Sequence, residues 1–106
     1  MDTEAYVEFL KSVLIKIENA LFLLDQKPAK HIPAYNKMLG VQQKLSGLDQ
    51  KHKEMLFPKI IATRSIISHF TNGLYEEAYS KILKLKGDLI TICLEIKNEK
   101  DTVTKT

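Results

Sequence analysis

The stretch YVEFLKSVLIKIENALFLL, residues 6–24, decides the fold class because its apolar side chains recur every three or four positions. This spacing is that of one face of an α-helix, whereas a half-buried strand alternates at every second position. Asp2 or Thr3 is expected to cap the helix, which should end near Asp25. Further apolar residues beside the stripe, among them Phe22, predict a helix mostly enclosed by the rest of the fold.

A second helix is expected over Ala34–Ser46, after a link that two prolines make rigid, Gln26–Pro33. Gly40 lies inside this helix, where a glycine indicates close approach of another helix. Gly47 follows its last residue, and we expect it to end the helix in a left-handed conformation.

The third segment keeps the same rhythm and stops at Asn72-Gly73, with Asp49 as its expected N-cap. Pro58 lies inside its apolar pattern. Because proline removes a backbone donor, it should either kink this helix or open its main part after a shorter lead-in, Gln50–Phe57.

The last segment starts at Leu74 or Tyr75, and Gly87-Asp88 leaves open whether it is one bent helix or two short ones. The expected core positions of the four segments are Tyr6, Leu10, Val13, Ile17, Leu21, Leu24, Met38, Val41, Leu45, Leu56, Ile60, Thr63, Ile67, Phe70, Ala78, Ile82, Leu85, Leu89, Ile92 and Ile96. The pattern predicts an all-α fold, an antiparallel bundle of four, or five, helices. One domain should cover residues 1–97, and residues 98–106 should be a polar, disordered tail.

The reactive side chains do not form any pattern typical of an enzyme or a metal site. The single cysteine, Cys93, lies in an apolar run and is expected in the core. The histidines, His31, His52 and His69, lack a second ligand at metal-binding spacing. No glycine-rich phosphate loop or nucleophile elbow occurs. We therefore expect no catalysis, no metal, no cofactor and no small-molecule substrate.

The charge balance is weakly basic, with a formal net charge of +3 over 106 residues. Of the 16 basic residues only Arg64 is an arginine, and base readout and bidentate phosphate contacts favour arginine. This disfavours nucleic acid as the partner. The chain shows neither a secretory signal pattern nor an apolar run long enough to span a bilayer, so a cytoplasmic protein with at most peripheral membrane contact is expected.

A protein-binding surface is predicted on the third and fourth segments, where Pro58 opens the helix locally. An exposed apolar patch rimmed by positive charge is typical of an interaction site. The alternative is that Phe57 covers the end of the core. The residues of the predicted surface are Phe57, Pro58, Lys59, Ile61, Arg64, Gly73 and Tyr75.

The order of segments resembles the C-terminal helical domain shared by the COPII outer-coat scaffold subunit and the steroid receptor RNA activator protein. The resemblance spans Val13–Leu89 and depends on Lys44-Leu45-Ser46 at a helix end and on Asn-Gly-Leu-Tyr-Glu-Glu-Ala at 72–78. Pro58 and the short region after Gly87 depart from that family. The resemblance implies a non-enzymatic interaction module of coat assembly or regulatory complexes, with another protein as its partner.

A second group is similar in length, charge and expected architecture alone: the bacteriocin immunity proteins, small basic helical bundles at the inner face of the membrane. Lysine-mediated nucleic-acid binding is a further alternative. These alternatives differ from a protein-interaction module in one respect. They depend on lysines, so their binding should weaken steeply with salt.

Overall fold

The computed structural model describes the backbone of residues 1–104 and the side chains of residues 1–99. This part of the chain is all-helical and has no strand, which confirms the predicted all-α class. Its five helices are α1 (Thr3–Leu24), α2 (His31–Ser46), α3 (Gln50–Met55), α4 (Phe57–Thr71) and α5 (Tyr75–Thr104). Within this range no helix combines the length and the apolar character needed to cross a membrane.

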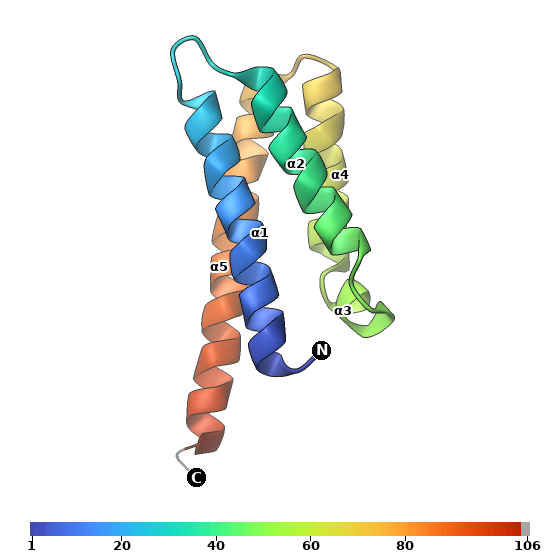
Figure 1. The fold of residues 1–106 in the computed structure, drawn as a ribbon, viewed down its shortest axis with the longest axis vertical. Coiled ribbons are helices and arrows are strands. Elements are labelled where there is room, and N and C mark those ends of the chain that lie inside the picture. The colour runs from blue at the N-terminus through green and yellow to red at the C-terminus, as the bar shows by residue number, and fades with distance from the viewer. Residues whose placement is uncertain (105–106) are drawn as a thin grey trace.

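The four long helices enclose one core. α1 and α4 each pack against both α2 and α5, and the short α3 packs on α4. Figure 1 shows that the α1–α2 and α4–α5 links lie at one end of the molecule and α3 toward the other, so the chain reverses direction between successive long helices. α5 extends past the start of α1 (Figure 1).

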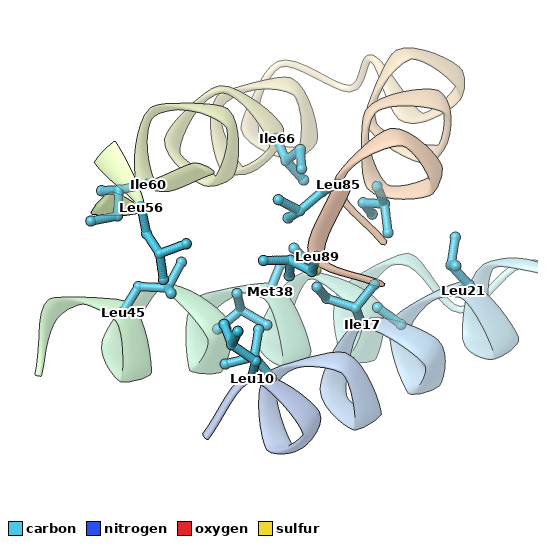
Figure 2. Close-up of a cluster of buried hydrophobic side chains, with 14 of the residues drawn as sticks. Leu10, Ile17, Leu21, Met38, Leu45, Leu56, Ile60, Ile66, Leu85 and Leu89 are labelled. Carbon is cyan, nitrogen blue, oxygen red and sulfur yellow. The ribbon is translucent and has the colours of Figure 1, made fainter. Parts of the chain in front are cut away.

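The core is a single cluster of apolar side chains contributed by every helix but α3 (Figure 2). Fully buried members include Leu10, Ile17 and Met38, each stabilising the fold by about 1.5–3 kcal/mol through its removal from water. The predicted stripe missed Ile66, which is fully buried, whereas Ile67 is only partly buried. α4 packs on two long helices, α2 and α5, at once, so its buried face is wider than one stripe.

α1 begins where the sequence predicts, because the carboxylate of Asp2 accepts a hydrogen bond of 2.7 Å from the backbone N–H of Ala5. The prediction that α1 is mostly enclosed is wrong. Phe22 is 65% exposed and Ile15 is 60% exposed. α1 packs on α2 and α5, and these two residues lie on its outer side.

α2 begins at His31, three residues earlier than predicted, and includes Pro33 in its first turn. A proline is tolerated there because the N–H groups of the first turn have no partner within the helix. At Gly40 the structure does not support the predicted close approach of another helix. The nearest atoms to a Cβ there belong to the flexible side chain of Lys16 of α1, at an ordinary van der Waals distance of 3.5 Å. The expected left-handed conformation at Gly47 is wrong, since its φ is −83° and its N–H donates to carbonyls of the preceding turn.

The third predicted segment is two helices, α3 and α4, separated at Leu56. Pro58 is the second residue of α4, so it opens this helix and does not kink it. Asp49 caps α3 as predicted, accepting a hydrogen bond of 2.9 Å from the N–H of His52.

α5 is one continuous helix, and Gly87-Asp88 does not split it. A mid-helix glycine costs about 1 kcal/mol relative to alanine, but Leu85 and Leu89 on either side are fully buried and hold the helix against the core. The helix also continues to Thr104, past the predicted domain boundary at residue 97. The rest of the expected tail, Lys105 and Thr106, lies outside the described residues.

Candidate partner-binding surfaces

The start of α4 presents an apolar patch to solvent. Leu56 is 1% exposed and fills the core position at the α3–α4 junction, and Phe57 next to it is 58% exposed. The alternative that Phe57 covers the core is therefore wrong. Ile61, 44% exposed, and Arg64 follow Phe57 at the i+4 and i+7 positions of the same helix face.

A hollow of about 550 Å³ adjoins this patch, between α3 and the first turns of α4. Its lining residues are Gln50, Lys53, Glu54, Phe57, Ile60 and Arg64. The rim predicted around Phe57 holds Arg64 and also Lys53, which the sequence prediction missed, together with the carboxylate of Glu54. No local pattern marks Lys53, because it reaches the hollow only through the way α3 folds back on α4.

Lys59 does not belong to this rim. Its ammonium Nζ lies 2.9 Å from Oδ2 of Asp88, and Lys84 binds the same oxygen at 3.2 Å. The hydrogen bonds from Lys59 and then Lys84 lower the pKa of the Asp88 carboxyl below its ordinary value. Lys59 therefore connects α4 to α5, and its predicted place at the partner surface is not supported by its contacts.

Gly73 and Tyr75 lie at the other end of α4, some 20 Å from Phe57 given a helical rise of about 1.5 Å per residue. Gly73 has a φ of +73°. Its N–H donates to the backbone carbonyl of Phe70, and the N–H of Leu74 donates to the backbone carbonyl of His69. This pair of bonds is a Schellman motif. The seven predicted residues therefore do not form one surface.

Tyr75 belongs to an aromatic cluster at that far end. Its ring stacks on His31, with centroids 3.8 Å apart and an interplanar angle of 8°, and it lies 6.2 Å from the ring of Phe70. A small hollow of about 160 Å³ adjoins the cluster, lined by His31, Ile32, Tyr35, Phe70, Thr71 and Tyr75. Tyr75 therefore packs the start of α5 against the start of α2.

His52 has a structural role, although its partners could not be predicted from the sequence. It is 7% exposed, its Nδ1 lies 2.6 Å from Oδ1 of Asp49, and its ring centroid is 4.5 Å from that of Tyr6. The backbone and ring hydrogen bonds of His52 lower the pKa of Asp49. Burial raises the pKa of Tyr6, whose hydroxyl is buried without a hydrogen-bond partner among the described residues. This contact holds α3 against α1.

The described side chains offer little for metal or nucleophilic chemistry. Among residues 1–99, no three histidine, cysteine, aspartate or glutamate side chains are close enough to hold a metal ion. Cys93 is half-buried, not fully in the core as predicted, and it lines a hollow between α1 and α5. Burial raises the pKa of its thiol, which disfavours the reactive thiolate at neutral pH.

Comparison with protein-family models, with curated proteins and with solved structures returned no match. The two family resemblances therefore stay predictions, and the functional argument depends on the surfaces of this chain alone.

Proposed function

We propose that this chain is a non-enzymatic helical module that binds another protein through the surface at the start of α4, namely Phe57, Ile61, Arg64 and Lys53. In this proposal the four long helices are an antiparallel bundle that serves as a fixed support. The observation that carries the proposal is the exposure of Phe57, 58%, beside the hollow between α3 and α4. Aromatic residues at the centre of an apolar patch dominate the binding energy of many protein interfaces.

The chemistry of the surface suggests what it binds. Two apolar side chains one helical turn apart can receive the apolar stripe of an amphipathic helix. Lys53 and Arg64 flank them and favour acidic residues beside that stripe. The partner we propose is a polypeptide segment with an apolar anchor and acidic neighbours, met in the cytoplasm; coat assembly and regulatory complexes are the settings that the first resemblance implies.

The test is co-purification from a native lysate at low and at high salt, with the wild type, Phe57→Ala and a matched control. Met55→Ala is the control because Met55 is 55% exposed and is not among the residues lining the hollow. The proposal predicts a protein partner that high salt does not remove, that Met55→Ala retains and that Phe57→Ala loses.

Two other outcomes would contradict the proposal. Binding to nucleic acid or to anionic vesicles that falls steeply with salt would instead favour the lysine-dependent alternatives. A partner retained equally by both variants would place the interface elsewhere on the molecule.

A further inference from the structure

The outer faces of α1 and α5 form a second apolar surface, which the proposed function does not use. A shared hollow and a hydrogen bond set the relative position of these helices. At one end Lys11 and Leu94 line the same hollow of about 540 Å³, and at the other the Tyr79 hydroxyl donates a hydrogen bond of 2.9 Å to Asp25. The helices therefore run antiparallel, with Ile15 level with Ile90 and Phe22 level with Leu83.

Large apolar side chains line both sides of this surface. From Lys11, the residues of α1 at spacings of four, three and four are Ile15, Glu18 and Phe22, so they continue along the same face. From Leu94 on α5, Ile90 and Leu83 lie four and eleven positions back, again on one face. The exposed fractions are 60% for Ile15, 65% for Phe22, 47% for Leu83, 39% for Ile90 and 55% for Leu94.

The exposed apolar area of this surface is larger than that of isolated apolar residues scattered over a protein surface. Five half-exposed side chains present apolar area on the order of 500 Å², which is at the upper end for a monomer and typical of an interaction site. With the polar residues around it, the face approaches the ~800 Å² per partner that a standard stable interface buries.

Charge along the two sides indicates what covers the surface. Glu18 lies on the α1 side and Lys86 lies on the α5 side, both outside the buried face. Glu8 of α1 already pairs with Lys11, 3.4 Å away on the same helix. In the antiparallel register Glu18 is level with Lys86. An acidic side chain on the α1 side therefore matches a basic side chain on the α5 side at the same height.

We propose that this face binds a second copy of the chain through a two-fold axis parallel to the helices. That axis places the α5 side of each copy against the α1 side of the other at the same height. Ile90 then meets Ile15 of the second copy, Leu83 meets Phe22 and Lys86 meets Glu18, each contact being made twice. A two-fold axis perpendicular to the helices would set α1 on α1 and lose these charge pairs.

Sedimentation equilibrium tests the association itself. The wild type should change from one chain of 12.1 kDa to two as its concentration rises from ~1 to ~100 μM, the range expected of a moderate interface. Leu94→Lys should weaken dimerisation at least tenfold. Met55→Lys, at a site of equal exposure, 55%, outside this face, should leave it unchanged. A wild type that stays monomeric, or equal behaviour of the two variants, would overturn the proposal.

Charge reversal tests the geometry. Glu18→Lys and Lys86→Glu should each weaken self-association several-fold, because each homodimer then holds two like-charge pairs. Mixing the two variants should restore dimers, since in the heterodimer both contacts between positions 18 and 86 again join opposite charges. Failure of the mixture to associate, with circular dichroism unchanged, would contradict the α1-on-α5 arrangement.

Discussion

The two ends of α4 each carry a phenylalanine, and the two side chains have opposite environments. Phe57, at the first residue, is 58% exposed, whereas Phe70, in the last turn, is 6% exposed. Phe70 lies seven residues after the buried Thr63 and so shares its face, but Phe57 is rotated away from that face. Position on the helix, and not residue type, decides which aromatic side chain stabilises the fold and which is available to a partner.

The neighbouring residues produce this difference. At the start of α4, Leu56 occupies the core and Pro58 opens the helix directly after it, which leaves Phe57 outside. At the end, the turn at Gly73 brings Tyr75 back toward Phe70, whose ring also lies 5.9 Å from that of Tyr35. The first turn of α4 is therefore open to solvent, and aromatic packing covers its last turn.

The largest effect is expected from Phe70→Ala, which should lower the free energy of unfolding by about 3–5 kcal/mol through the lost burial and the cavity left behind. Urea denaturation followed by circular dichroism measures it. A loss below ~1 kcal/mol would mean that the aromatic cluster is not a closed part of the core.

Gly73→Ala should cost about 1 kcal/mol, because an alanine at φ +73° is strained although nothing lies within 4 Å of its Cβ. Gly87→Ala is the matched control, since its Cβ also meets nothing but its backbone is helical. That variant should gain about 0.5–1 kcal/mol. Thermal unfolding measures both variants. If both substitutions raised the stability, or both lowered it, the left-handed turn at Gly73 would be contradicted.

A smaller, pH-dependent effect is expected at the ion pair that joins the start of α4 to α5. The pKa of Asp88 is lowered in the folded protein by Lys59 and Lys84. Its contribution is therefore present above the unfolded-state pKa of about 3.9 and is lost as the pH falls through the lower folded value. Asp88→Asn should remove this part of the acid dependence, worth under about 1 kcal/mol because the pair is partly exposed. An identical acid profile for variant and wild type would exclude the pair as a contributor.

The sequence predicted the fold well wherever local rules decide it. Three-four periodicity placed Leu10, Ile17 and Leu89 in the core, Asp2 and Asp49 at helix starts, and Gly73 in the turn before α5. It left open whether Gly87 splits the last helix, which the buried neighbours of that glycine hold as one. It also placed the start of α2 three residues too late, because Pro33 is tolerated in a first turn.

The candidate site was less predictable because a surface joins residues from separate elements. The sequence identified Phe57, Ile61 and Arg64, which follow one another on one helix, but not Lys53, which α3 supplies. It also grouped Gly73 and Tyr75 with them, although the length of α4 separates the two ends. The pairing of Lys59 with Asp88, 29 residues away, leaves no local pattern in the sequence.

The smallest stability effect belongs to Phe57→Ala, and this variant tests the central claim most directly. Because Phe57 is 58% exposed, its free energy of unfolding should change by no more than about 0.5 kcal/mol. In the same preparation the protein partner retained by the wild type at high salt should be lost. A stability loss on the order of 3 kcal/mol, or an unchanged partner, would contradict the account: the first would make Phe57 part of the core, and the second would remove the start of α4 as the binding surface.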